Sequence, residues 1–209
     1  MGKRMSLFGL LGALCLSSPA LTTAQEGFSC LTEEQEALLQ LVNDYRGDNG
    51  LPPVPWSITL TQVGQTHVED ARKNFATLFR APCNLHSWSF DQPNRWSGMC
   101  YTSDHAQAQR MWDKPREISG GIFTGNGYEL AASGYASIEA ALRGWQNSPG
   151  HNPVMLNEGS WSSIRWRSMG VGVSEGSYYF LWFSDQADVR PPALRCEPEL
   201  FEDDFEDGT

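Results

Sequence analysis

Cysteines near both ends of the chain most restrict how it can fold. Cys30 precedes the first predicted helix, Cys196 follows the last predicted strand, and Cys83 and Cys100 lie between them. Four cysteines in an oxidising compartment indicate two disulfides, for which three pairings are possible. We favour Cys83 with Cys100, which closes a local loop, and Cys30 with Cys196, which ties the start of the domain to its end. Free buried thiols are the alternative.

The first 24 residues have the pattern of a secretory signal peptide. Lys3 and Arg4 precede an apolar run over residues 7–16, and the small residue Ala24 follows at a suitable cleavage position. The run is too short for a membrane span, which needs about 20 apolar residues. The sequence therefore predicts a secreted protein, extracellular or periplasmic, with no membrane span after cleavage.

The rest of the chain has the length of one domain. We expect the domain over residues 25–198 and an acidic tail over residues 199–209, in a monomer. The formal net charge is -10, whereas nucleic-acid binding requires basic patches. The negative charge therefore argues against a nucleic-acid partner. A small ligand or a protein remains as the possible partner.

Hydrophobic periodicity predicts three helices, and capping residues predict two short ones, of which one lies in "TSDHAQAQRMW" after Thr102 or Ser103 and the other follows His151. The first begins after Thr32, which forms a capping box with Gln35, and ends near Gly47. The second is expected over about residues 60–74 and the third over 136–145. Asn152 and Pro153 are expected as the N-cap and first residue of the second short helix.

Strands are fewer and lie mostly near the end. Residues 168–184 alternate as two strands around a turn at 174–176, which predicts a hairpin. "HSWSF" is the only strand candidate in the middle of the chain. Gly170 and Gly172 leave one strand face bare, where another segment can approach closely. These elements predict an α+β domain in which helices cover both faces of an antiparallel sheet.

Two of the histidines have ordinary structural explanations. His67 lies on the apolar face of the second predicted helix, where it is expected to be a core residue satisfied by one hydrogen bond. His105 is surrounded by polar residues and is expected to be a solvated surface side chain.

The other two histidines lie at junctions between regular elements, where binding groups collect. His86 is in "NLHSWS", and His151 follows the helix-terminating "SPG". Glu129 in "NGYELAA" is the best candidate for a carboxylate partner. Two histidines and one carboxylate can hold zinc or another divalent cation, or form a metal-free hydrogen-bonded network.

Several segments, in order, resemble the CAP superfamily of cysteine-rich secretory proteins, antigen 5 and pathogenesis-related proteins. They are "LLQLVNDYRGDNGLPPVPWS", "NLHSWS", "GYELAA", "GWQNSPGHNPVMLN" and "MGVGVSEGSYYFLWF", which together cover about residues 34–185. The chain is most similar to the bacterial secreted members. The resemblance implies a three-layer α-β-α sandwich with a central antiparallel sheet and a large cleft.

The resemblance also implies which residues line that cleft. His86 and His151 match the two family histidines, which in some members bind zinc or another divalent cation together with acidic residues. A strict alignment places Tyr128 at the family's glutamate position and Glu129 one residue later, so either could be the cleft residue. Ser148 stands where eukaryotic members have a second acidic residue, so a complete set of four ligands is not expected.

Three functions are compatible with this sequence. The first is a secreted binding module whose cleft takes a lipid, sterol, peptide or glycan, with or without a metal. The second is a metal-dependent hydrolase of the peptidase or esterase type, although neither an HExxH helix nor a GxSxG elbow is present. The third is a structural domain that presents loops to a protein partner.

Overall fold

The computed structural model describes residues 30–174, 178–192 and 195–196. The predicted signal peptide and acidic tail therefore lie outside the described residues. The elements follow the order α1 (Glu33–Asp48), α2 (Ile58–Leu78), α3 (Ala108–Trp112), α4 (Lys114–Ile118), β1 (Tyr128–Ser133), α5 (Ile138–Gln146), α6 (Asn152–Leu156), a 3-10 helix (Gly159–Trp161), β2 (Ser168–Ser174) and β3 (Tyr178–Ser184).

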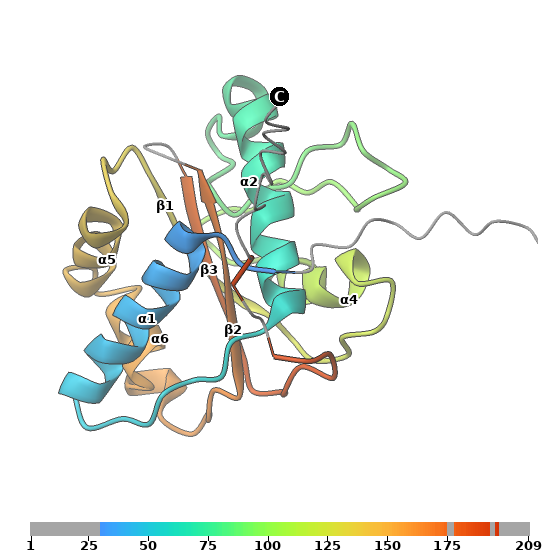
Figure 1. The fold of residues 1–209 in the computed structure, drawn as a ribbon. Coiled ribbons are helices and arrows are strands. Elements are labelled where there is room, and N and C mark those ends of the chain that lie inside the picture. Colours follow the sequence, from blue (N-terminus) through green and yellow to red (C-terminus); the bar gives the residue numbers. More distant parts are fainter. Residues whose placement is uncertain (1–29, 175–177, 193–194, 197–209) are drawn as a thin grey trace, which may run out of the picture.

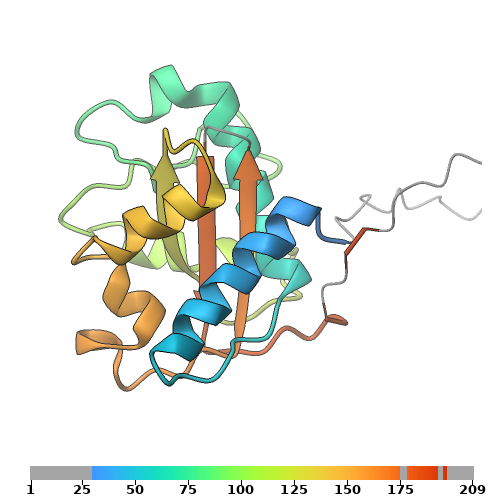
Figure 2. The same cartoon turned by 60° about the vertical axis from the view of Figure 1, so that its left-hand side comes forward.

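The three strands form an antiparallel sheet with the order β1-β3-β2. Helix α2 covers one face, while α1 and α5 cover the other, as Figure 1 shows from the side of the sheet. Turning the molecule brings α1 and α5 in front of the strands (Figure 2). The predicted α+β sandwich with an antiparallel central sheet is confirmed.

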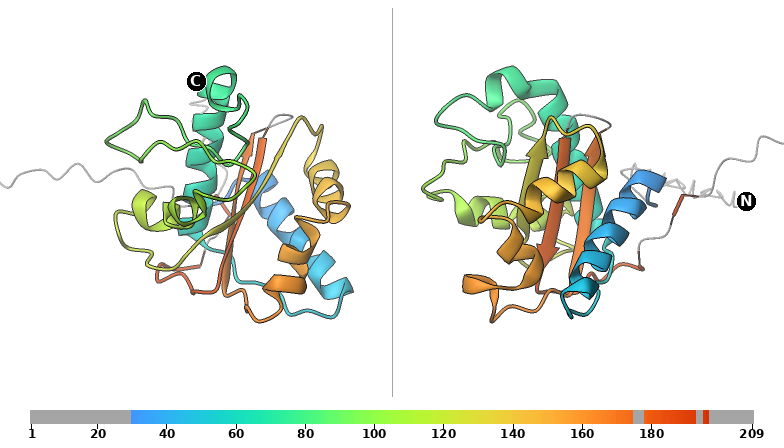
Figure 3. Two further views of the ribbon diagram at one scale, coloured as in Figure 1. Left: turned by 180° about the vertical axis from the view of Figure 1, so that it is seen from behind. Right: turned by 90° about the vertical axis from the view of Figure 1, so that its left-hand side faces the viewer.

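The two faces of the sheet build two separate cores because successive side chains in a strand point to opposite sides. Leu130, Leu181 and Phe183 pack with α1 and α5, whereas Phe180 and Trp182 pack with α2. Figure 3 shows these layers from behind and from the left, with the segment that contains α3 and α4 on the α2 side. Along β1, Glu129 has the same alternation as Ala131, on the α2 side.

Glycines allow α2 to lie unusually close to β2. A Cβ added at Gly172 would meet the backbone oxygen of Gly64 at 2.0 Å, and one added at Gly170 would meet the backbone nitrogen of Thr61 at 2.2 Å. Real Cβ contacts do not occur at such distances, so only glycine fits at these positions. The predicted close approach to the bare strand face is confirmed, and the approaching segment is α2.

Local sequence signals predicted α1, α2, α5 and α6, whereas α4 was not predicted. Thr32 and Gln35 form the predicted capping box at the start of α1. At α6 the prediction is wrong by one residue, because His151 occupies the N-cap position and Asn152 is already helical. The Asn152 side chain instead accepts a hydrogen bond from Tyr45 OH at 2.8 Å.

The strand predictions were less successful. "HSWSF" forms no strand, since only an isolated bridge joins Trp88 to Met99. Strand β1, which carries Glu129, was not predicted. Its sequence is short and rich in alanine, and it becomes a strand because β3 offers it a long paired edge from Tyr178 to Phe183.

Two disulfides, Cys30–Cys196 and Cys83–Cys100, join the cysteines in the favoured pairing. The first ties the segment before α1 to the segment after β3, and the second closes the loop that follows α2. Among the described residues, no helix combines the length and the apolar character that crossing a membrane requires.

Candidate functional site

Glu129 is the centre of a buried hydrogen-bonded group. Its Oε2 lies 2.6 Å from Nδ1 of His67, and its Oε1 lies 2.7 Å from Nδ1 of His86. The side chains of Glu129 and His67 have no exposed surface, whereas the His86 side chain is 20% exposed. The carboxylate thus bridges one fully buried imidazole and one imidazole that reaches the surface.

Packing on both sides holds the ring of His67 in place. It stacks between Trp88 and Phe180, at centroid distances of 4.1 Å and 4.0 Å. Its Nε2 lies 2.9 Å from the carbonyl oxygen of Ser87. The predicted burial of His67 is confirmed, but the expectation of a single hydrogen bond is wrong, because both ring nitrogens have partners.

A pocket of about 340 Å³ lies beside this group, at the edge of the sheet formed by β1. Its lining combines polar side chains with apolar walls: His86, Tyr101, His105, Ala108, Met111, Trp112, Tyr128, Glu129, Gly150, His151, Val154 and Trp161. Neighbours in a strand point to opposite faces, yet Tyr128 and Glu129 both line the pocket. The pocket therefore extends around the edge of the sheet. Both Tyr128 and Glu129 contribute to its lining.

His151 enters the pocket from the opposite layer. Helix α5 ends at Gln146, and the "SPG" turn brings His151 to the start of α6. Its Nδ1 lies 2.8 Å from Ser148 Oγ. Ser148 is not among the lining residues, so it orients His151 rather than facing the pocket itself. Burial, assisted by the nearby His86, lowers the pKa of His151 below its ordinary value.

Tyr101 and His105 form another polar pair at the pocket. The Tyr101 hydroxyl lies 2.9 Å from Nδ1 of His105. His105 has a φ of 59°, in the left-handed region that few residues other than glycine adopt. Its predicted exposure is confirmed, but its position in the lining of the pocket was not predicted. Burial raises the pKa of Tyr101, and the charge of Glu129 adds to the effect.

Opposing effects act on the Glu129 carboxyl group. Burial alone would raise its pKa, because a charge loses its hydration. Interactions with His67, followed by those with His86, outweigh burial and hold the pKa of Glu129 below its ordinary value.

The predicted metal site of His86, Glu129 and His151 is not supported. Within the described part of the chain, no group of three or more His, Cys, Asp or Glu side chains is arranged to hold a metal ion. The two carboxylate oxygens of Glu129 lie within hydrogen-bond distance of the Nδ1 atoms of His67 and His86. The three side chains therefore do not form a metal site in the described part of the structure.

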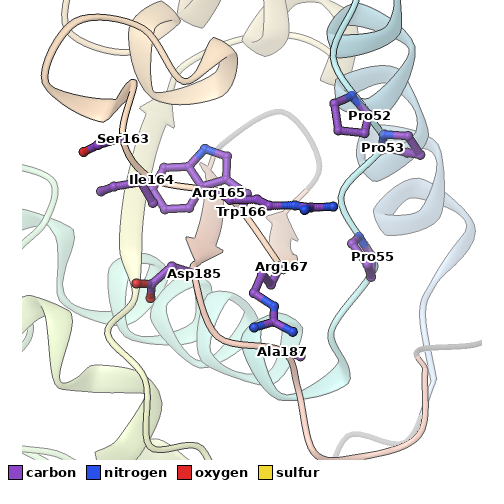
Figure 4. A pocket seen from close by; sticks show the side chains of 10 residues that line it. All are labelled: Pro52, Pro53, Pro55, Ser163, Ile164, Arg165, Trp166, Arg167, Asp185 and Ala187. Carbon is purple, nitrogen blue, oxygen red and sulfur yellow. The ribbon is translucent and has the colours of Figure 1, made fainter.

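A second hollow, of about 710 Å³, lies between the segment before α2 and the segments that flank β2 and β3. Figure 4 shows the side chain of Arg165 extending toward the proline segment and that of Arg167 toward Ala187. The complete lining is Pro52, Pro53, Pro55, Ser163, Ile164, Arg165, Trp166, Arg167, Asp185 and Ala187. We call it the arginine groove. It contains no histidine, so the candidate site is the histidine pocket.

Comparisons with known proteins agree with this fold. The model of the cysteine-rich secretory protein family, CAP, matches residues 39–184. No curated protein matches the chain. An extracellular protein containing an SCP domain from Bacillus anthracis is 23% identical with a TM-score of 0.50, over 73% of this chain and 40% of its own. At that identity the likeness concerns the fold alone.

Two other solved structures are more distant. A cysteine-rich secretory protein from Staphylococcus aureus is 16% identical with a TM-score of 0.46, over 73% of this chain and 39% of its own. An outer surface protein from Borrelia burgdorferi is 14% identical with a TM-score of 0.44, over 71% of this chain and 90% of its own. The chain thus spans about two fifths of the length of the Bacillus and Staphylococcus proteins.

Proposed function

Because this chain belongs to the cysteine-rich secretory protein (CAP) family, we propose that it is an extracellular binding module whose histidine pocket takes a small ligand. The observation that carries the proposal is the combination of apolar walls with a few fixed polar groups in one pocket. Small-molecule sites typically have this composition, because apolar walls supply affinity and polar groups set orientation.

The pocket's two kinds of surface indicate an amphipathic ligand. Met111, Trp112, Val154 and Trp161 give it apolar walls, while the imidazole of His86 marks a polar end. Its volume of about 340 Å³ is near the lower end of the range of roughly 300–1,000 Å³ for ligand sites. A small lipid, or one end of a sterol, peptide or glycan, fits this description.

Export of the protein is part of the same proposal. Two disulfides are typical of oxidising compartments, and the pattern of the first 24 residues is that of a signal peptide. Extracellular and surface proteins occur among the solved structures with a similar fold.

Tryptophan fluorescence tests the binding function. Trp112 and Trp161 line the pocket, whereas Trp96 is buried in the α2-side core away from it. A titration with a fatty acid, a sterol, a dipeptide and a disaccharide should change the emission for at least one of them. The change should shrink in Trp112→Phe and Trp161→Phe but persist in Trp96→Phe. Unchanged emission with every compound would contradict a binding pocket and favour the interaction domain.

The metal-dependent hydrolase receives no support from the donor set, since no group of three or more His, Cys, Asp or Glu side chains among the described residues is arranged to hold a metal ion. We therefore derive no reaction step through a metal. The histidine pocket is interpreted as a metal-free hydrogen-bonded site.

A further inference from the structure

The arginine groove carries two guanidinium groups without ion-pair partners among the described residues. Arg165 and Arg167 are exposed, and neither side chain makes a hydrogen bond within the part of the chain that the structure describes. Asp185 is the acidic side chain of the lining, and it is exposed as well. The lining thus has a positive balance in a chain whose formal net charge is -10. A local excess of positive charge on an acidic protein attracts an anionic partner.

The segment before β2 presents both arginines on one side. Arg165 and Arg167 are exposed while Trp166 and Ser168 are buried, which is the alternation of an extended chain. Residues two positions apart in such a chain are separated by about 7 Å. In Figure 4 the side chain of Arg165 extends toward the proline segment and that of Arg167 toward Ala187. The two charges therefore serve different walls of the same hollow.

The proline wall of the groove is apolar. Pro52, Pro53 and Pro55 have no backbone N–H to donate. The carbonyl oxygen of Pro52 accepts hydrogen bonds from the side chain of Arg46, and that of Pro55 accepts one from Met169 N at 2.9 Å. The charged donors of the groove are therefore its two arginines, whose planar guanidinium groups suit carboxylates. An occupant that fits combines carboxylates with apolar side chains.

The acidic tail of this chain has that composition. Residues 200–207 read "LFEDDFED", in which Phe201 and Phe205 enclose three carboxylates. These residues lie outside the described part of the chain, so their match to the groove is one of chemistry. In an extended chain, Glu202 and Asp204 would project to one side with the same two-residue spacing as the groove arginines.

The covalent chain allows the acidic tail to reach the groove. Pro192 forms an isolated bridge with Ser57, two residues after the groove residue Pro55. Cys196 follows Pro192 by four residues, so it lies within about 28 Å of Pro55. Asp204 is eight residues beyond Cys196, and eight extended residues span up to about 29 Å. Residues from Asp204 onward can therefore contact the groove of the same molecule.

Other arginines near hollows are less suitable partners for the tail. Arg72 lines a hollow together with Glu33, Glu34 and Glu69, where the balance of charge is negative. Arg190, close to the start of α2, already donates a hydrogen bond to the side chain of Gln62 at 3.1 Å. The arginine groove combines a positive balance with an apolar wall.

We propose that the arginine groove binds the acidic tail of the same chain. Carboxylates of residues 202–207 pair with Arg165 and Arg167, and a phenylalanine packs against the prolines. A tethered segment acts at an effective concentration of the order of 1 mM, so even a contact with a Kd of about 1 mM forms in about half of the molecules. An external anionic partner must then compete with the tail. The groove shares no lining residue with the histidine pocket, so this contact is independent of the proposed binding function.

NMR of the full chain, with and without the charge of the tail, tests the contact. Arginine Nε–Hε signals report on the groove, and Arg165→Gln and Arg167→Gln assign two of them by loss of signal. We expect both signals to shift when the tail is neutralised and Arg143, an exposed residue of α5, to keep its position. Unchanged signals at both groove arginines would overturn the proposal. The neutralised variant carries Glu202→Gln, Asp203→Asn, Asp204→Asn, Glu206→Gln and Asp207→Asn.

Salt and protein concentration identify the partner of the groove. Raising NaCl from about 0.05 to about 0.5 M should move the wild-type signals of Arg165 and Arg167 toward those of the neutralised variant, because salt screens exposed charges. At fixed salt, the difference between the two proteins should not depend on protein concentration, since the contact forms within one molecule. A difference that grows with concentration would assign the tail of a second copy as the occupant and overturn the proposal.

A synthetic peptide of residues 199–209, added to the neutralised variant, tests the match of this sequence to the groove. We expect saturable shifts at Arg165 and Arg167 with a Kd of about 1 mM. The same peptide with Phe201→Ser and Phe205→Ser should bind about tenfold more weakly, because it lacks the side chains that pack against the prolines. Equal affinities would overturn the apolar part of the proposal. Absence of saturable shifts with the natural peptide would overturn recognition of the tail.

Discussion

His67 of α2 and Glu129 of β1 are 62 positions apart in the chain, yet their Nδ1 and Oε2 atoms lie 2.6 Å apart with neither side chain exposed. This contact joins the helix on one face of the sheet to the edge strand that borders the pocket. It therefore links the stability of the fold to the chemistry of the site.

Glu129→Gln should be strongly destabilising. The change disrupts the buried hydrogen bonds to His67 and His86, and a buried polar group left without a partner costs about 1–3 kcal/mol. Urea unfolding at pH 7 measures the loss. Glu139→Gln is the control, because Glu139 is an exposed side chain of α5 and should change the free energy of unfolding by less than about 0.5 kcal/mol. Similar values for both variants would contradict a buried hydrogen-bonded group centred on Glu129.

Gly172→Ala and Gly47→Ala should have opposite effects. A Cβ at Gly172 would lie 2.0 Å from the backbone oxygen of Gly64, so α2 must move away from β2, at a cost of about 3 kcal/mol. A Cβ at Gly47 meets nothing within 4 Å, and alanine in a helix is favoured over glycine by about 0.5–1 kcal/mol. Thermal unfolding of both variants checks the signs. A neutral Gly172→Ala would show that α2 and β2 are less closely packed than described.

Loss of the two disulfides should have unequal effects. Cys30 and Cys196 are 166 positions apart, whereas Cys83 and Cys100 are 17 apart. In the chain-entropy model the longer loop contributes about 2 kcal/mol more to the free energy of unfolding. Double serine variants of each pair, compared by urea unfolding, test this order. Equal losses would show that the chain-entropy difference does not govern these bonds.

The stability of the protein should fall as the pH decreases below about 6.5, in part through His151. Burial and the nearby His86 lower the pKa of His151, so the folded state takes up this proton at a lower pH than the unfolded state. Protonation then favours unfolding, and stability decreases with pH. His151→Gln removes this contribution, so its unfolding free energy should change less between pH 6.5 and 5.5 than that of wild type. Equal pH dependence in the two proteins would contradict the lowered pKa.

Features that depend on nearby residues were predictable from the sequence. The capping box of Thr32 and Gln35 needs only one helical turn, and the hairpin needs only the alternation on either side of its turn. Gly170 and Gly172 predicted that another segment approaches this strand closely, but they did not identify the segment. The three-layer sandwich and the shared cleft were predicted from the family resemblance.

Features that depend on distant contacts were not predictable. The "YELAAS" segment is a strand because β3 pairs with it, and its own composition favours a strand only weakly. His67 was predicted to be a core residue because it lies on the apolar face of the predicted helix. Its second partner, Glu129, is brought to it only by the packing of α2 on the sheet.

The histidine pocket is proposed to bind a small amphipathic ligand, and chemical-shift mapping with a medium-chain fatty acid tests this proposal most directly. The described structure offers one reporter in each hollow: the indole of Trp112 in the histidine pocket and the guanidinium of Arg165 in the arginine groove. Saturable shifts at Trp112 and at the ring nitrogens of His86, with Arg165 unchanged, are the predicted result. Saturable shifts confined to Arg165 and its neighbours, or no saturable shift at Trp112 and His86, would contradict it.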